Sequence, residues 1–356
     1  MTSSEIIKLR LFNQQLAEKK ITKPHELVSW MGAMQAQDYA MAKWAIGLRI
    51  PGSDDTMVEK AFNEGKILRT HVLRPTWHFV TPRDIRWMIE LTAPRILSSL
   101  AHNDRHLSLD KKILKKTNDT LAKALEGGKQ LTRDEVKSVL QKAKIDTSEL
   151  RFIHLLEHAE LDRVICSGTK MGNQFTYALF DERASPKTME REEALAELTK
   201  RFFTSRGPAT IYDFAWWSGL SVSEAKKGIE MVKNKFKRES IDGKEYFFRS
   251  PASFKNEMAQ TALLLPNYDE YVISYKDRTE AIDKKYRAVI LKERNAVFTN
   301  SILINGKIEG IWKRAITNNS FIVKTRFFST LTRTRQQLLT KAITRYGKFL
   351  GKSLPR

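Results

Sequence analysis

The fold of the N-terminal third is decided by residues 67–80, which read Ile67-Leu68-Arg69-Thr70-His71-Val72-Leu73-Arg74-Pro75-Thr76-Trp77-His78-Phe79-Val80. Alternation and β-branching in this stretch predict two strands, and Arg74-Pro75 predicts a tight corner between them. The segments on its N-terminal side have the apolar spacing of helices. The expected helices cover residues 4–16, 24–35, 38–48 and 57–63. Helices followed by a β-hairpin describe a winged helix.

The same pattern recurs twice further along the chain, which predicts a tandem array. The second copy is expected to contain a helix capped by Thr132, a recognition helix at 149–160, strands at 163–166 and 174–179, and a wing at 167–173. In the third copy a turn containing glycine separates two helices, as in a helix-turn-helix. Its expected elements are helices at 211–217 and 222–233 and strands at 236–241 and 244–249, which Asp242-Gly243 joins.

The C-terminal part changes to short apolar runs after Ser250-Pro251 and predicts a small all-β unit. The expected strands are 262–265, 270–273, 288–291, 301–304, 308–312 and 320–324, followed by a basic amphipathic helix at 335–352. We therefore predict an α+β protein with three tandem winged-helix modules, a small C-terminal β-barrel and a basic terminal helix. The predicted boundaries are 1–105, 106–185, 186–251 and 252–356.

Charge is the strongest global signal in this chain of 356 residues. Lys and Arg number 62 against 41 Asp and Glu, which gives a net charge of +21, and more than half of the excess follows Glu309. A polyanion, most often nucleic acid, is the expected partner, and its binding should weaken with salt. Charge that serves solubility, or an anionic membrane surface, is the alternative interpretation.

The remaining composition is that of an ordinary globular protein, with 41% hydrophobic residues. No apolar run approaches the roughly 20 residues that cross a bilayer, and the N-terminus lacks the features of a secretory signal. Cys166 is the only cysteine, so no internal disulfide can form. We expect a cytoplasmic, nucleoid-associated monomer that has no membrane partner.

Two glutamines, Gln35 and Gln37, follow an apolar helical run and are separated by one residue. On a helix their side chains would point roughly 200° apart, whereas in an extended or turn conformation they can converge. An amide donates and accepts hydrogen bonds but takes no proton at neutral pH. We therefore predict that the helix ends near Gln35 and that both amides serve one ligand. Two solvated polar residues at a helix end are the alternative.

Histidines give weaker signals. The run His154-Leu155-Leu156-Glu157-His158 fits the H-x-x-E-H pattern of zinc peptidases, and its two histidines would share a helix face. Packing of the same helix needs Leu155 and Leu156, which argues against zinc. His71 and His78 are expected to face a groove or to be satisfied in the core. The sequence contains no P-loop, Rossmann glycine pattern, nucleophile elbow or CxxC pair, so we expect no nucleotide cofactor and no metal.

Several motifs together resemble the winged-helix DNA glycosylases of the AlkZ/YcaQ type, from about residue 5 to residue 335. They are Gln35-Ala36-Gln37, residues 69–78, Gln174-Phe175-Thr176-Tyr177, Asp213-Phe214-Ala215-Trp216-Trp217-Ser218-Gly219-Leu220 and Leu264-Leu265-Pro266-Asn267-Tyr268-Asp269-Glu270-Tyr271. The resemblance implies a C-shaped clamp on double-stranded DNA and excision of alkylated purines, including the unhooking of interstrand crosslinks. It also implies the Gln-x-Gln motif of the AlkZ branch, which falls on Gln35 and Gln37. The YcaQ branch has Asp at the second place, and here Asp38 comes one residue later.

The resemblance thus makes Gln35 and Gln37 the expected catalytic residues of a monofunctional, metal-independent hydrolysis without a cofactor. We expect Gln37 to hold the attacking water and Gln35 to fix the sugar or the second proton of that water. The residues expected to contact DNA are Arg69, His71, Arg74, Thr76, His78, Lys170, Lys313, Arg314, Arg333 and Arg335. A non-catalytic winged-helix DNA-binding protein or regulator is the main alternative, and a zinc hydrolase is a weaker one.

Overall fold

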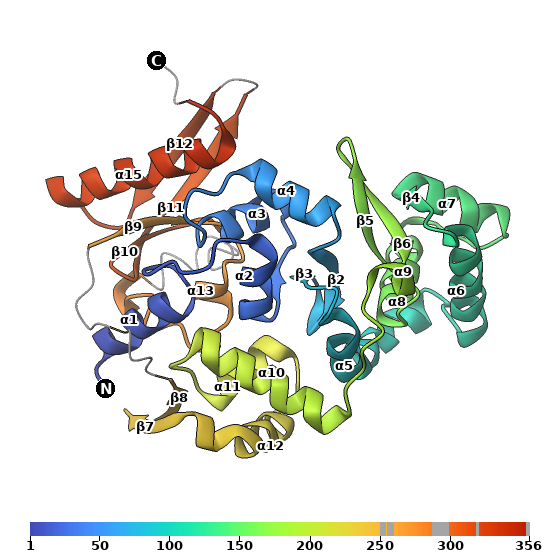
Figure 1. Cartoon of the computed structure of the whole chain (residues 1–356), viewed down its shortest axis with the longest axis horizontal. Coiled ribbons are helices and arrows are strands. Elements are labelled where there is room, and N and C mark those ends of the chain that lie inside the picture. Colours follow the sequence, from blue (N-terminus) through green and yellow to red (C-terminus); the bar gives the residue numbers. More distant parts are fainter. Residues whose placement is uncertain (250–253, 255–259, 287–298, 318–319, 354–356) are drawn as a thin grey trace.

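The computed structural model describes residues 1–249, 254, 260–286, 299–317 and 320–353. We call the three predicted copies of the helix-and-hairpin pattern the first, second and third repeats. Figure 1 shows the second repeat (green) on one side of the molecule and the C-terminal elements (red) on the other. The first repeat (blue) lies between them, and the third repeat (yellow) lies below the first. Mixed helices and short antiparallel sheets make up the described chain, so the α+β class is confirmed.

The first repeat contains the predicted hairpin. Its elements are α1 (Ser3–Asn13), α2 (Pro24–Met31), β1 (Met34–Gln35), α3 (Tyr39–Gly47), α4 (Asp55–Asn63), β2 (Leu68–Val72), β3 (Arg74–Val80) and the long helix α5 (Ile85–His106). Strands β2 and β3 pair antiparallel around Leu73, whose φ is 66°, and β1 joins the other edge of β3. Helix α2 ends four residues before the predicted end at Gln35, because Gly32 takes a φ of 74° and turns the chain.

The second repeat has a hydrophobic core of its own. Its elements are α6 (Lys111–Leu125), β4 (Gln130–Thr132), α7 (Arg133–Lys142), α8 (Glu149–Leu161), β5 (Ile165–Met171), β6 (Gln174–Leu179) and α9 (Phe180–Arg183). The strands form one antiparallel sheet in the order β4-β6-β5. Leu121, Leu140 and Leu155 are fully buried between α6, α7 and α8. Thr132 caps α7 through a capping box with Glu135, as its position in the sequence predicts.

The third repeat shares its core with the first. It consists of α10 (Arg191–Arg206), α11 (Ile211–Ser218), α12 (Val222–Val232), the 3₁₀ turn η1 (Lys233–Lys235), β7 (Lys237–Ile241) and β8 (Lys244–Phe248). Capping boxes begin α11 at Thr210 and α12 at Ser221, and Gly219 in the left-handed conformation ends α11. Trp217 and Phe202 pack in one cluster with Trp87 of α5, which ties the two repeats together.

The predicted barrel is wrong for the described residues, which form an open four-stranded sheet. The C-terminal elements are β9 (Ala262–Leu265), α13 (Glu270–Ile273), β10 (Ser301–Ile304), β11 (Lys307–Ile316), β12 (Phe321–Phe327) and α15 (Arg333–Leu350). All pairs are antiparallel in the order β12-β11-β10-β9. Helix α15 packs beside β9, so apolar surface is buried by a helix rather than by closure of the sheet.

The predicted strand at 270–273 is also wrong, because these residues form the helical turn α13. Asp269 caps that turn by accepting the N–H of Tyr271 at 2.8 Å. A buried apolar run of four residues fits a strand or a helix equally well by periodicity, and here the cap decides. The predicted strand at 288–291 lies outside the described residues.

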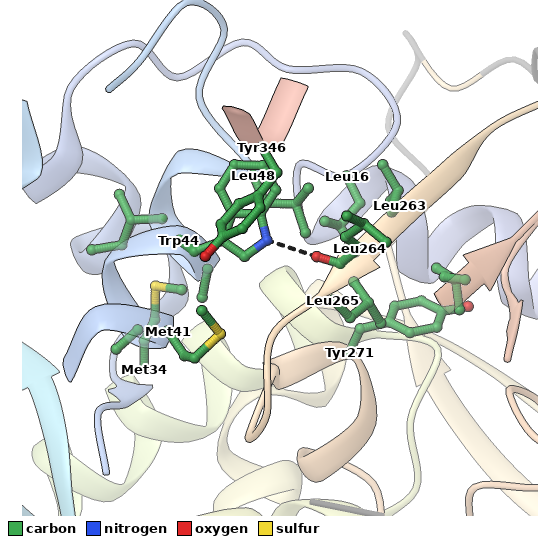
Figure 2. Close-up of a cluster of buried hydrophobic side chains, with 14 of the residues drawn as sticks. Leu16, Met34, Met41, Trp44, Leu48, Leu263, Leu264, Leu265, Tyr271 and Tyr346 are labelled. Carbon is green, nitrogen blue, oxygen red and sulfur yellow. Dashed lines mark hydrogen bonds between the residues drawn. The ribbon is translucent and has the colours of Figure 1, made fainter. Parts of the chain in front are cut away.

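The first repeat and the C-terminal unit share one core, which Figure 2 shows around Trp44. The indole N–H of Trp44 donates to the carbonyl oxygen of Leu264 at 2.7 Å, and the ring of Tyr346 lies 4.9 Å from the indole. Nearby, Arg49 and Asp269 form a fully buried pair through two hydrogen bonds of 2.8 Å. Met34 of β1 belongs to the same core, so residues from both ends of the chain pack around this short strand.

Candidate functional site

Gln35 lies in β1, opposite His78 of β3, and only 9% of it is exposed. The guanidinium of Arg74 donates to its side-chain oxygen Oε1 at 3.0 Å. An arginine can only donate hydrogen bonds, so the atom that faces Arg74 must be the amide oxygen. The NH₂ group of Gln35 therefore points away from Arg74 and is oriented as a donor.

Gln37 is exposed and follows directly on β1. Its Oε1 accepts the backbone N–H of Trp77 at 3.4 Å, and the N–H of Ala36 donates to the carbonyl oxygen of Trp77 at 2.7 Å. The chain is extended at Gln35 and bends at Gln37, so neither glutamine lies in a helix. Both amides are held by residues of strand β3.

Glu270 of α13 binds the backbone of β1. Its Oε1 accepts the N–H of Gln35 at 2.9 Å, while Oε2 accepts from Arg206 at 2.7 Å and from the indole of Trp217 at 3.0 Å. Burial by itself would raise the pKa of Glu270. The charge of Arg206 and the hydrogen bonds of that guanidinium, of Ser274 and of the Gln35 N–H outweigh burial and lower the pKa to about 2. The carboxylate is therefore ionised and holds its donors in place.

The other face of the hairpin is turned toward the second repeat. Arg69 donates to the carbonyl oxygen of Ala36 at 3.0 Å, and its guanidinium lies 4.2 Å from the ring centre of Trp77. His71 lies 4.8 Å from the same ring and contacts Glu160 of α8 through both its ring Nδ1 and its backbone N–H, at 2.8 Å each. Burial lowers the pKa of His71, but the charge of Glu160 and its hydrogen bond raise the pKa by a larger amount. The net shift of the pKa is therefore upward.

His78 and Thr76 form a small polar group next to Gln35. The ring Nδ1 of His78 lies 2.8 Å from the carbonyl oxygen of Thr76, which makes Nδ1 the protonated nitrogen. His78 is fully buried, and burial together with the charge of Arg74 lowers its pKa to about 3. The imidazole is therefore neutral, and it is enclosed by protein rather than turned toward a groove.

The remaining residues expected to contact DNA differ in whether their side chains bind other residues of the protein or face solvent. Lys170 pairs with Glu59 at 3.0 Å, Arg314 donates to the hydroxyl of Tyr346 at 2.7 Å, and Arg335 lies 3.5 Å from Glu309. Lys313 on β11 and Arg333 at the start of α15 are exposed. These two residues are the ones in this group whose side chains face solvent most fully.

The two histidines of the H-x-x-E-H run on α8 both lie near the carboxylate of Asp104. His158 Nε2 lies 3.0 Å from Asp104, and His154 Nδ1 lies 3.7 Å from the same carboxylate. Among the described residues, no group of three or more His, Cys, Asp or Glu side chains is arranged to hold a metal ion. None of the described helices is long and apolar enough to span a bilayer.

Comparison with known proteins identifies the family. The sequence model of the family described as "DNA glycosylase AlkZ-like" matches residues 28–349. The chain belongs to the AlkZ-like DNA glycosylase family. It is 22% identical over 333 residues to the "Interstrand DNA cross-link repair glycosylase" of Streptomyces sahachiroi, and the match covers 87% of each protein. The AlkZ-like resemblance seen in the sequence motifs is thereby confirmed.

A solved structure shows the same fold. The structure of "Streptomyces sahachiroi DNA glycosylase AlkZ" matches with a TM-score of 0.80 and 20% sequence identity, over 100% of this chain and 98% of that chain. At this identity the match shows the fold alone. It agrees with the mixed helices and sheets that the AlkZ-like family assignment predicts.

Two residues that hold the candidate glutamines were not predicted from the sequence, although both lie in the quoted motifs. Trp77 binds Gln37 through its backbone N–H, and Glu270 binds Gln35. The available signal for Glu270 was the pair Asp269-Glu270 within an apolar segment of a strongly basic chain. Acidic residues in such surroundings are almost never fully buried without partners, so this pattern favours buried ion pairs.

Proposed function

We propose that this AlkZ-like protein is a monofunctional DNA glycosylase that hydrolyses the N-glycosidic bond of N7-alkylated purines in double-stranded DNA. Its substrates include purines that take part in interstrand crosslinks, by analogy with the name of the Streptomyces relative. The observation that supports this best is the placement of Gln35 and Gln37 in the short non-helical segment between α2 and α3, with both amides held by β3. Gln35 and Gln37 are the proposed catalytic residues.

The chemistry needs little acid assistance, because an N7-alkylated purine is a cation and leaves as a neutral base. The bond between the base nitrogen and C1′ breaks, and the oxygen of a water molecule attacks C1′ of the oxocarbenium-like sugar. Oriented amide dipoles can favour that developing charge and position the water without taking its proton. The proton of the attacking water leaves to solvent.

The geometry refines the role of each amide. Gln37 is exposed, and a carbonyl oxygen that accepts one hydrogen bond keeps a second lone pair, so its amide can still hold a water. Gln35 is buried and presents its NH₂ as a donor, because Arg74 occupies its oxygen. We assign Gln37 to the attacking water and Gln35 to an oxygen of the sugar or of the same water.

The proposal includes the finer architecture and the partners. The three repeats act as winged-helix modules, with boundaries at 1–105, 106–185 and 186–251, and residues 252–356 form the C-terminal unit. Each repeat combines helices with an antiparallel hairpin, which supports this assignment. We propose that one monomer binds duplex DNA through its basic surface, including Lys313 and Arg333. A cytoplasmic, nucleoid-associated location belongs to the same proposal.

Base release from a duplex that carries 7-methylguanine tests the function. The wild-type protein should release 7-methylguanine, and Gln37→Ala should bind the duplex equally well but release base about 100- to 1000-fold more slowly. Gln141→Ala is the matched control, because Gln141 is an exposed glutamine on α7 that lies outside the motifs quoted for the family resemblance. Equal release by Gln37→Ala would remove Gln37 from the mechanism. Binding without any release by the wild type would favour a non-catalytic DNA-binding protein.

A further inference from the structure

Two large aromatic side chains of α11 are exposed to solvent. Tyr212 is 51% exposed and Trp216 is 40% exposed, whereas Phe214 and Trp217 of the same helix are fully buried. Residues four positions apart lie on the same face of a helix. The two rings therefore form one aromatic stripe along the outer face of α11.

Cationic side chains from the segment after α13 lie beside both rings. Lys276 Nζ is 5.8 Å from the ring centre of Tyr212, and the guanidinium carbon of Arg278 is 5.4 Å from the ring centre of Trp216. The indole N–H of Trp216 donates to the carbonyl oxygen of Ile273 at 2.8 Å, so the orientation of this ring is fixed. The stripe is thus an ordered surface of alternating rings and positive charges.

Two acidic residues near the stripe, Asp213 and Asp277, bind other groups of the protein. Asp213 is buried, and its carboxylate accepts the N–H of Lys276 at 2.9 Å and caps α11. Asp277 pairs with Lys244. Lys276 is exposed, so its charge remains available to an anionic ligand, and Arg278 adds a second positive charge beside Trp216. A cavity of about 820 Å³ opens beside Tyr212, between the start of α11 and the turn of the β7–β8 hairpin.

The end of α11 lies next to the corner of the β2–β3 hairpin, whose strand β3 holds the candidate catalytic residues of β1 and the bend after it. Gly219 directly follows α11, and a Cβ atom at this position would lie 2.1 Å from the carbonyl oxygen of Leu73. Leu73 is the corner of the β2–β3 hairpin and precedes Arg74, which holds Gln35. Arg95 donates to the carbonyl oxygen of Gly219 at 2.8 Å and adds an exposed positive charge at this end.

We propose that Tyr212 and Trp216, together with Lys276, bind unpaired single-stranded DNA by base stacking. Aromatic rings interleaved with cations suit a strand whose base faces are free, and such faces are hidden within a duplex. This binding site goes beyond the proposed glycosylase activity and does not depend on base release. It would hold a strand that has separated from its complement next to the candidate catalytic strand.

Fluorescence anisotropy with a fluorescein-labelled oligothymidylate tests the site. Tyr212→Ala/Trp216→Ala should raise the Kd for this oligonucleotide about 10- to 100-fold, as expected for the loss of stacked bases. The double variant should keep the affinity of the wild type for an undamaged duplex. Trp216→Phe should retain most of the affinity, because it keeps a ring. Lys276→Gln should lower the salt dependence of binding, whereas the stacking variants should leave it unchanged.

Met231→Ala is the matched control, because Met231 is a comparably exposed apolar residue on the neighbouring helix α12. Unchanged oligothymidylate binding by the double variant would overturn the proposal. A second test needs only wild-type protein, namely ultraviolet crosslinking to an oligonucleotide that contains 5-iododeoxyuridine. Crosslinks to Tyr212 or Trp216 are expected, and crosslinks confined to other residues would also overturn it. Neither result bears on the release of 7-methylguanine, so failure here is distinct from failure of the glycosylase assignment.

Discussion

The carboxylate of Glu270 accepts the backbone N–H of Gln35 at 2.9 Å and thereby joins two residues that are 235 positions apart in the chain. The same carboxylate binds Arg206, whose guanidinium also donates to the carbonyl oxygens of Met31 and Ala33 at 2.6 and 2.8 Å. These two carbonyls flank Gly32, where α2 ends. A buried ion pair therefore sets both the end of α2 and the position of β1.

Glu270→Gln should destabilise the fold strongly. It leaves the fully buried guanidinium of Arg206 without a counter-charge, and breaking such a pair costs about 3–5 kcal/mol. Urea denaturation followed by circular dichroism gives the free energy of unfolding. Glu192→Gln removes a solvent-exposed pair with Lys227 and should cause no measurable change. A similar free energy of unfolding for both variants would contradict this role of Glu270.

The stabilisation by Glu270 should depend on pH in a defined direction. The pKa of this carboxyl group is about 2 in the folded protein, compared with 4.5 for an unperturbed glutamate. A group whose pKa is lowered by folding stabilises the protein above its unfolded pKa. The advantage of wild type over Glu270→Gln in free energy of unfolding should be full above pH 4.5 and should decrease as the pH falls toward 2. A constant difference across this range would refute the assignment.

Arg74→Gln should reduce kcat for release of 7-methylguanine about 10- to 100-fold, because the Gln35 amide loses the donor that fixes its orientation. KM should change little if Arg74 acts through Gln35 rather than on the DNA backbone. Arg83→Gln, which removes an exposed arginine between β3 and α5, is the control. An effect of Arg74→Gln on KM alone would indicate that Arg74 contacts DNA instead.

His78 should remain neutral well below the usual titration range of histidine. Its pKa is lowered to about 3 from 6.5, mainly by burial and then by the charge of Arg74. The unfolded chain takes up a proton below pH 6.5 that the folded chain does not, so stability should fall as the pH falls from 6.5 toward 3. NMR of the His78 ring should show constant chemical shifts through this window, and a titration near pH 6.5 would disprove the prediction.

Lys313→Gln should lower the slope of log Kd against log salt concentration for duplex DNA by about 1, because one phosphate contact is lost. Lys313 is exposed on β11. Lys187→Gln removes an exposed lysine that precedes α10 and should leave the slope unchanged. Equal slopes for Lys313→Gln and wild type would place the DNA away from this part of β11.

The local elements could be predicted well, because their signals are short-range. Alternation in residues 67–80 indicated the β2–β3 hairpin, and Thr132 was correctly predicted to cap a helix. The end of α2 was misplaced, because the apolar spacing continues past Gly32 to Met34. The backbone conformation at Gly32, with its φ of 74°, ends the helix there, and Arg206 holds the carbonyl groups on both sides of this glycine.

The sequence by itself determined the class of fold, the β2–β3, β5–β6 and β7–β8 hairpins, the basic charge and the pair of glutamines. These features depend on residues that lie close together in the chain, where periodicity and turn chemistry act. Tertiary structure alone decided that the described C-terminal strands form an open sheet and that Glu270 and Arg206 hold β1. Contacts such as Glu270 with Gln35 join residues far apart in the chain. Their partners depend on how whole elements pack, which no local pattern of one sequence specifies.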